Sequence, residues 1–353
     1  MAPRPEDAAA PSPPPQRVRA ARPPTPGRFL ARRGPAVRAL TSAVALTGLL
    51  GMVTSCGGAT GAGGQGSQGG LDRQVTLAVA PVINAAPLYI AQQKGLFAKE
   101  GIKVTLKPVT NVAAAFPAMA TGDTDMVYSS LSPFLIAVGN GQDMKLVTEV
   151  SRGAPKTVGI VSKNPAIRTP KDLEGKKIAT PTMTGCNLIA GPTLESAGVD
   201  PKKIHWVELL YANQGPALDQ GSIDAACTVE PFITTLGTQL GTHLVLDALT
   251  GPNQKVALDG VYAMSSYAKA HAKTVTALRD AIAEASAMAN EDPALVRSVA
   301  KSVARTPADV AARIALPSFV TKNDPALLAQ PVDRLVKAGA IPRRIAPAGL
   351  LAR

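Results

Sequence analysis

The stretch VTLAVAPVINAAPLYIAQQKGLFAKEGIKVTL, residues 75–106, decides the structural class of the chain. Its first five residues are mostly β-branched or aliphatic, which is typical of a strand. Leu88, Ala91 and Leu96 then recur at helical spacing, with Pro87 suited to a first helical turn and Gly101 to a stop. The last five residues alternate between apolar and polar and indicate a second strand. A strand, a helix and a strand in this order predict a parallel strand pair covered by a helix.

The same alternation continues outward from this stretch. We expect further strands at 125–128 and 144–150 and helices at 112–121 and 131–139. A second series follows, with strands near 157–161, 177–180, 204–209, 224–228 and 243–247 and helices near 187–197, 214–220 and 231–240. The last third is mostly helical, and its cap-and-proline pairs Asp292-Pro293, Thr306-Pro307 and Asp324-Pro325 predict helix starts. Two strand–helix series followed by helices predict a two-lobed α/β protein.

Composition fits a globular protein and gives no support to nucleic-acid binding. Of the 353 residues, 46% are hydrophobic and 18% are charged, which is enough apolar material for a core. The net charge is +12, but residues 1–56 hold eight arginines against Glu6 and Asp7, so half of the excess lies there. Elsewhere no basic run is longer than a pair, so no basic surface for nucleic acid is expected.

Residues 1–56 are typical of an export signal. An uncharged run of 17 residues, 39–55, ends at Cys56 and is short of the about 20 residues that a membrane-spanning helix needs. Val53-Thr54-Ser55-Cys56 resembles the lipobox of bacterial lipoproteins, in which small residues precede the cysteine that receives diacylglycerol. We therefore expect a lipid anchor on Cys56; the alternative is an ordinary signal peptide with an incidental cysteine. Arg32-Arg33 leaves both general and twin-arginine export open.

The segment after Cys56 is expected to be a tether. Residues 57–70 contain eight glycines in 14 positions, and such a chain has a mean reach of roughly 20 Å. This reach would let a folded domain move close to a membrane surface without being part of it.

Four strings carry a resemblance to a known family. They are 84–102, with Asn84-Ala85-Ala86-Pro87-Leu88-Tyr89-Ile90-Ala91 and Lys94-Gly95-Leu96-Phe97; Ala118-Met119-Ala120-Thr121-Gly122-Asp123; Lys171-Asp172-Leu173-Glu174-Gly175-Lys176; and Gly221-Ser222-Ile223-Asp224 followed by Val229-Glu230-Pro231-Phe232. In this order they resemble the nitrate/sulfonate/taurine and thiamine-pyrimidine-precursor binding proteins of ABC importers. The resemblance covers about residues 74–340.

The resemblance implies a two-lobed type II periplasmic-binding-protein fold with a central ligand cleft and extra C-terminal helices. The domains would be 1–56 (signal), 57–72 (tether), 73–158 (first lobe), 159–257 (second lobe) and 258–353 (return to the first lobe and C-terminal helices). It also implies capture of a small solute, either an anion such as a sulfonate, nitrate or taurine or a pyrimidine-like heteroaromatic. The partners would be ABC permease subunits, and the protein would sit at the outer face of the cell membrane.

Candidate ligand contacts follow from the sheet architecture. Ligands of open α/β sheets bind beyond the carboxyl ends of strands, where loops and helix N-termini converge. This rule selects Asn84 and Ala85 after the first strand, Ser129 and Ser130 after the third, and Thr182, Thr184, Gly185 and Asn187 in the second lobe. Tyr211 could stack on a planar ligand, Glu230 could meet a ligand amine or ring nitrogen, and Asp259 could be a cleft contact.

Several of these residues have a structural alternative. Ser129, Thr184 and Asn187 could instead cap the helices that follow them. For Glu230 a fixed structural hydrogen bond is the alternative, and Asp259-Gly260 could form a hinge turn. Cys186 and Cys227 fall in the same lobe and are either disulfide-bonded or free and buried, because spacing alone cannot place two Cα atoms within about 7 Å.

An enzyme on the same fold is the competing function. Some relatives make the thiamine pyrimidine from their own histidine with a cysteine-rich iron site, whereas His205, His243 and His271 are widely spaced here and no cysteine cluster is present. No metal-ligand spacing, catalytic triad, phosphate loop or dinucleotide fingerprint stands out. We therefore expect no catalytic residue, metal or cofactor. A surface scaffolding lipoprotein is a third alternative, which the tether would suit.

Overall fold

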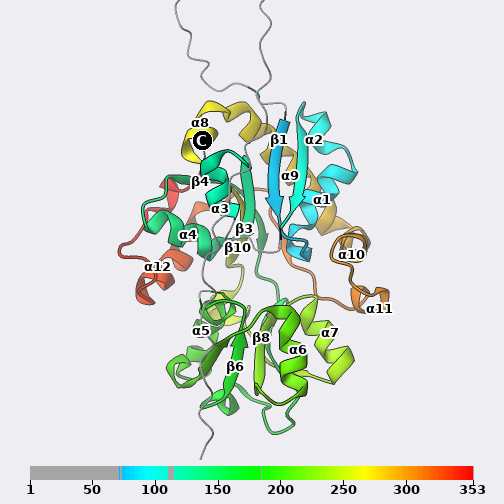
Figure 1. The fold of residues 1–353 in the computed structure, drawn as a ribbon, viewed down its shortest axis with the longest axis vertical. Coiled ribbons are helices and arrows are strands. Elements are labelled where there is room, and N and C mark those ends of the chain that lie inside the picture. The colour runs from blue at the N-terminus through cyan, green and yellow to red at the C-terminus, as the bar shows by residue number, and fades with distance from the viewer. Residues whose placement is uncertain (1–70, 72–73, 110–114, 184, 353) are drawn as a thin grey trace, which may run out of the picture. The chain divides into compact units, whose positions relative to one another are not determined.

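A computed structural model describes residues 71, 74–109, 115–183 and 185–352, which form a two-lobed α/β fold (Figure 1). The expected signal, Cys56, the glycine-rich segment 57–70, the start of the helix at 112–121, and Thr184 lie outside the described residues. Within the described residues, no helix is both long and apolar enough to cross a membrane.

The first lobe is built on a six-stranded sheet with the order β11-β4-β10-β3-β1-β2. Its strands are β1 (Gln74–Val79), β2 (Lys103–Pro108), β3 (Met126–Ser130), β4 (Met144–Arg152), β10 (Ala257–Met264) and β11 (Ser318–Phe319). Strand β1 pairs in parallel with β2 and β3, whereas β10 lies antiparallel between β3 and β4. The beginning of β10 therefore meets the carboxyl ends of β3 and β4 at one edge of the sheet.

Helices cover both faces of this sheet because side chains alternate along each strand. In β1, Leu77 and Val79 enter one core while Ala78 enters another. The first core is covered by α1 (Ala86–Gln93), α2 (Leu96–Lys99), α9 (Ala272–Glu291), α10 (Pro293–Ser302) and α11 (Ala308–Ala311). The second is covered by α3 (Ala115–Thr121), α4 (Leu131–Gly139) and α12 (Ala329–Lys337). The short helices η1 (Ile83–Ala85), α8 (Ser265–Ala270), η6 (Pro325–Leu328) and η7 (Pro347–Gly349) complete this lobe.

The second lobe contains a five-stranded sheet with the order β7-β6-β8-β5-β9. Its strands are β5 (Val158–Ser162), β6 (Lys177–Thr180), β7 (His205–Glu208), β8 (Ala225–Val229) and β9 (His243–Asp247). Helix α5 (Cys186–Ser196) packs on one face, and α6 (Tyr211–Asp219) and α7 (Phe232–Leu240) pack on the other. The short helices η3 (Pro170–Leu173), η4 (Pro201–Lys203) and η5 (Gly251–Asn253) lie between these elements. Because β6 runs parallel to β7 and β8, the segments that follow these three strands leave from one edge.

Most predicted elements are confirmed, and the departures have local causes. The strands at 177–180 and 243–247 and the helix at 131–139 have the predicted bounds. Helix α6 begins at Tyr211 rather than 214. Its first turn lacks apolar residues at helical spacing and is held instead by the stacking of Tyr211 on Phe232. A helix starts next to Thr306-Pro307 as predicted, but the N-cap residue of α11 is Pro307 and the Thr306 side chain does not cap it. Asp292, by contrast, accepts bonds from two backbone N–H groups of α10.

Candidate functional site

The polar centre of the first lobe is Asp259, near the start of β10. Its Oδ2 accepts hydrogen bonds from Asn84 Nδ2 at 2.8 Å and from Ser151 Oγ at 2.6 Å. Asp259 lies opposite Ser130 of β3 and Ser151 of β4, since β10 runs antiparallel between those strands. Asn84 reaches the same carboxylate from the turn after β1. Three strand ends therefore converge on one acid, as the carboxyl-end rule predicts.

Gly260 allows this close packing of strands. A β-carbon at this position would lie 2.5 Å from Leu146 Cδ1 and 2.9 Å from the backbone oxygen of Thr148. Asp259 and Gly260 both lie inside β10, whereas the chain returns from the second lobe through residues 248–256. The hinge-turn alternative for this pair is therefore wrong.

Burial gives Asp259 unusual acid–base behaviour. Removal from water raises the pKa of its carboxyl, and hydrogen bonding by Ser151, Asn84, Ser130 and Tyr128 opposes that rise. The pKa of Tyr128 is raised well above its usual value, first by burial and then by the charge of Asp259. The buried Tyr128 hydroxyl makes no hydrogen bond of standard geometry within the described residues. The site therefore combines a buried carboxyl whose pKa is raised with a neutral phenol.

The side chains of the last two residues of β3 do not act as helix caps. Ser130 is the N-cap residue of α4 and is exposed, but its side chain makes no capping hydrogen bond. The Ser129 hydroxyl is buried and donates to the backbone oxygen of Ser130 at 3.1 Å. Ala85 is fully buried and its amide donates to the Val82 backbone oxygen at 3.1 Å, so the structure does not present this residue to a ligand. Of these three, Ser130 presents a polar side chain beside Asp259.

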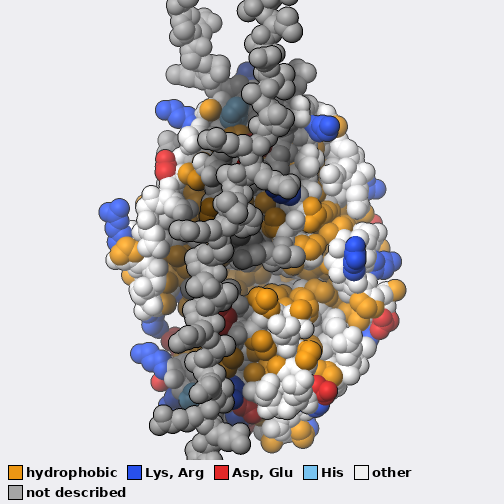
Figure 2. Space-filling view, viewed as in Figure 1, with side chains coloured by type: hydrophobic (Ala, Val, Ile, Leu, Met, Phe, Trp, Pro, Cys, Tyr) orange, Lys and Arg blue, Asp and Glu red, His pale blue; other side chains and the backbone are white. Residues whose placement is uncertain are grey.

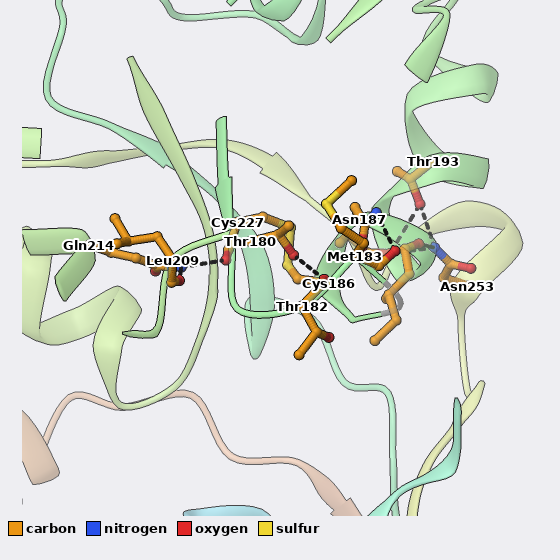
Figure 3. Close-up of a disulfide and its surroundings, with 12 residues drawn as sticks. Thr180, Thr182, Met183, Cys186, Asn187, Thr193, Leu209, Gln214, Cys227 and Asn253 are labelled. Carbon is orange, nitrogen blue, oxygen red and sulfur yellow. Dashed lines mark hydrogen bonds between the residues drawn. A yellow bond between two sulfur atoms is a disulfide. The ribbon is translucent and has the colours of Figure 1, made fainter. Parts of the chain in front are cut away.

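In the second lobe, a loop connects β6 to α5. Thr182 is exposed, and its backbone oxygen accepts from Thr180 Oγ1 at 3.0 Å and from the Gly185 amide at 3.1 Å. Asn187 Nδ2 donates to the Met183 backbone oxygen at 2.8 Å, while its Oδ1 is buried and has no partner within the described chain (Figure 3). The N-cap of α5 is Gly185, without a side-chain cap, so Asn187 is not the cap either.

Figure 3 also shows the Cys186–Cys227 disulfide, which settles the open question about these cysteines. Their Cα atoms are 5.8 Å apart, and both side chains are buried. The bond joins the first residue of α5 to the middle of β8. The loop that carries Thr182 and Asn187 is therefore attached covalently to the central strand of the second sheet.

Aromatic and aliphatic side chains lie at the same edge of the second lobe. Tyr211 and Phe232 are stacked with ring centroids 5.1 Å apart. Burial raises the pKa of Tyr211, and the charge of Asp259 raises it further. Leu210 and Met183 are 65% and 47% exposed, which is rare among the large hydrophobic residues of the described chain. Figure 2 shows hydrophobic side chains at the surface over α6 and α7.

Glu230 fits its structural alternative better than ligand contact. Its Oε1 accepts from Thr234 Oγ1 at 2.7 Å and from the Ala315 amide at 3.1 Å, and its Oε2 accepts from the Thr234 amide at 3.1 Å. The side chain is buried, and burial raises the pKa of this carboxyl. These bonds hold the first turn of α7 and the segment after α11.

The candidate residues thus form two groups. One group gathers around Asp259 and contains Asn84 and Ser130, and the other contains Thr182, Gly185 and Asn187 at the start of α5. Sequence reasoning did not single out Ser151. Ser151 lies just beyond the predicted strand 144–150, so the same carboxyl-end rule applied to that strand would have found it.

Comparison with known proteins gives one family and several similar proteins. Residues 82–295 match the family model described as NMT1/THI5 like. The taurine-binding periplasmic protein of Escherichia coli (strain K12) is 25% identical over 271 residues, which is 74% of this chain and 84% of that protein. The alkanesulfonate-binding protein SsuA from Xanthomonas axonopodis pv. citri, bound to MOPS, has a TM-score of 0.68 at 20% identity over 80% of this chain and 99% of its own.

An enzyme also shares the fold. The desulfurization enzyme DSZB has a TM-score of 0.61 at 15% identity, covering 80% of this chain and 96% of its own. At such low identity the likeness concerns the fold alone. The architecture is therefore that of periplasmic binding proteins, and it hosts both binding proteins and an enzyme.

Proposed function

Because the chain belongs to the NMT1/THI5-like family, we propose that it is an extracytoplasmic solute-binding lipoprotein that delivers a small organic ligand to an ABC import permease. The observation that carries the proposal is the network around Asp259, where three strand ends bring an acid, an amide and a hydroxyl together. The similarity to a taurine-binding periplasmic protein over 74% of the chain supports the same role.

The two groups of polar residues suit the two ends of one ligand. Asp259 would accept a hydrogen bond from a ligand N–H, with Ser130 and Asn84 beside it. A sulfonate would lie away from that acid, at Thr182 and the backbone N–H groups of Cys186 and Asn187 at the start of α5. Taurine and MOPS, named with two relatives, both combine a sulfonate with an amine nitrogen. We therefore propose a small organic sulfonate with a nitrogen donor as the ligand class.

The exposed apolar side chains favour a ligand with an organic body over nitrate. Met183 and Leu210 follow the ends of two adjacent parallel strands, because Thr180 at the end of β6 lies in register with Glu208 at the end of β7. Exposed hydrophobic groups beside a polar site are typical of ligand-binding surfaces. If the aliphatic chain or ring of a ligand packed against Leu210, the apolar surfaces of the ligand and of the Leu210 side chain would both be removed from water.

The Tyr211–Phe232 pair favours a second ligand class, a pyrimidine-like heteroaromatic. A planar ring can stack on such a pair, and a ring nitrogen that carries hydrogen could donate to Asp259. This candidate needs no anion site at α5. The two classes therefore differ in whether substitutions at the start of α5 weaken binding.

A thermal-shift panel on the protein, after bound ligand has been stripped under denaturing conditions and the chain refolded, tests the proposal. The panel contains taurine, MOPS, butanesulfonate, nitrate and pyrimidines. A ligand present at about 100 times its Kd stabilises the native state by about 2.7 kcal/mol, which raises Tm by several degrees. We expect such shifts for taurine and MOPS, and a smaller one for butanesulfonate, which lacks the nitrogen donor. No shift with any member of the panel would contradict the proposed import role.

The proposed anchor is tested separately by Cys56→Ala. Without the thiol no diacylglycerol can be attached, so the protein is expected in the soluble rather than the membrane fraction. Ser55→Ala is the matched control, because it keeps the cysteine and a small neighbour. Membrane attachment of the Cys56→Ala protein would rule out lipid anchoring at this residue.

The enzymatic alternative predicts turnover instead of stable binding. Incubation of the protein with each ligand that shifts Tm, followed by mass spectrometry of the small molecule, distinguishes the two. Recovery of unchanged ligand in a 1:1 amount supports capture, and multiple equivalents of product would support an enzyme.

A further inference from the structure

We propose that the Cys186–Cys227 disulfide is a positioning element of the ligand site, which fixes the loop after β6, one of the two second-lobe segments that face the ligand, to the central strand β8. The inference rests on the proposed function, because it assigns the loop after β6 and the start of α6 to ligand contact. It concerns the covalent bond, which the ligand would not touch.

The loop after β6 has few other attachments. Apart from Thr184, which lies outside the described chain, the hydrogen bonds that involve residues 181–187 join residues no more than four positions apart. The Thr182 side chain is exposed, and so is that of Met183. The disulfide, by contrast, joins residues 41 positions apart. It is therefore the long-range connection of the segment that carries Thr182 and Asn187.

Strand β8 is a rigid place for that attachment. It lies between β6 and β5 in the middle of the sheet, and Cys227 pairs with Ile160. The Cys227 side chain is fully buried. Because Cys227 is held in the core of the sheet, a covalent bond to it restricts the motion of the first turn of α5.

The segment after β7 is attached to the same residue. The buried Gln214 of α6 donates from Nε2 to the backbone oxygen of Cys227 at 3.3 Å and to that of Leu209 at 3.3 Å. Leu210 and Tyr211 lie between these attachment points. Cys227 thus connects to both ligand-facing segments, covalently to one and through Gln214 to the other.

The rest of α5 is held without the disulfide. Asn253 Nδ2 donates to Thr193 Oγ1 at 2.8 Å and to the backbone oxygen of Ala248 at 2.6 Å, and Thr193 Oγ1 also donates to Ala248. Ala190 and Leu194 are fully buried in the second-lobe core. Loss of the disulfide should therefore loosen the loop and the first turn, while the helix body stays packed.

The test uses the full chain with Cys186→Ala/Cys227→Ala. Hydrogen exchange followed by mass spectrometry is expected to become at least tenfold faster in 181–189 and unchanged in β9 (His243–Asp247). Dissociation of MOPS is expected to become about tenfold faster with little change in its association rate. Cys186→Ala/Cys227→Val keeps more of the buried volume and serves if the double alanine variant does not fold.

Val199→Ala is the matched control. Val199 is buried in the same core but follows the opposite end of α5. It is expected to lower Tm without accelerating exchange in 181–189 or the release of MOPS. This control separates a local effect from a general loss of stability.

The outcomes are distinguishable. Unchanged exchange in 181–189, or equal acceleration throughout the second lobe, would overturn the positioning role. If the wild-type chain binds neither MOPS, taurine nor butanesulfonate, the proposed ligand class fails, while the exchange pattern still decides the role of the disulfide.

Discussion

Asp259 is a buried carboxylate whose hydrogen-bond partners in the described chain are neutral. Asn84 and Ser151 donate to one of its oxygens, and no cation among the described residues forms an ion pair with it. Burial of a charge with neutral partners costs free energy, which is why the pKa of this carboxyl is raised. A ligand that brings a positive charge or an N–H donor would offset that cost. Asp259 would therefore destabilise the protein without ligand and favour ligand binding.

Removal of a hydroxyl beside Asp259 should be costly. Ser151→Ala deletes the 2.6 Å donor to the carboxylate and leaves a buried acceptor with fewer partners, so we expect the unfolding free energy to fall by about 1.5–3 kcal/mol. Urea unfolding measures this change. Ser129→Ala, which removes a bond to a backbone carbonyl, is the control and should cost about 1 kcal/mol or less. An equal loss for both variants would refute the special role of Ser151.

The raised pKa of Asp259 predicts a pH dependence. Because the folded protein holds this proton more tightly than the unfolded chain, the stabilisation from Asp259 is complete below its unfolded pKa and is lost as pH rises through its folded pKa. Asp259→Asn removes this titration. The unfolding free energy of the variant minus that of the wild type should therefore increase as pH rises from 4 through the folded pKa, and then level off. Urea unfolding across pH measures it; a difference that is constant with pH would contradict the prediction.

At the scale of the elements, the segments after β6 and β7 combine a polar and an apolar surface. The backbone N–H groups at the start of α5 and the Thr182 hydroxyl are polar, whereas Leu210 and the stacked Tyr211 beside them are apolar. Such a surface suits a ligand with a charged head and an organic body.

Leu210→Ser removes an apolar side chain of that surface and leaves its polar part unchanged. The side chain is 65% exposed, so the substitution should change stability by no more than about 0.5 kcal/mol. Affinity for butanesulfonate should fall by about tenfold because apolar contact worth about 0.8 kcal/mol per methylene group is lost. Affinity for taurine should change little. Titration calorimetry measures both, with Val336→Ser on α12 as the exposed control. Equal losses for the two sulfonates would exclude an apolar contact at Leu210.

At the scale of the whole molecule, each lobe has its own sheet and its own cores. The two crossings, 153–157 and 248–256, are short, and a fold of this kind closes around ligand by bending at such crossings. Small-angle scattering should therefore give a smaller radius of gyration with saturating MOPS than without it. Asp259→Asn with the same MOPS concentration should show a smaller change, because fewer molecules bind. An unchanged radius for the wild type at saturation would argue against closure.

The local elements and several candidate residues could be predicted from the sequence. The periods of 2 and 3.6 residues give strands and helices within a few positions, and the order of these elements gives the α/β class. Asn84, Ser130 and Thr182 follow from the end of a strand and its direction alone. Those features depend on contacts between near neighbours, which the sequence records directly.

The tertiary structure alone decides which distant residues meet. Ser151 and Asp259 are 108 positions apart and come together because β10 inserts between β3 and β4 after the chain has built the second lobe. Cys186 and Cys227 form a disulfide because α5 packs over β8. The Glu230 carboxylate already has a hydrogen-bond donor, because the later segment that contains Ala315 brings its amide to Glu230 Oε1. Strand order and helix packing depend on the burial of apolar surface over the whole chain, so no local pattern contains them.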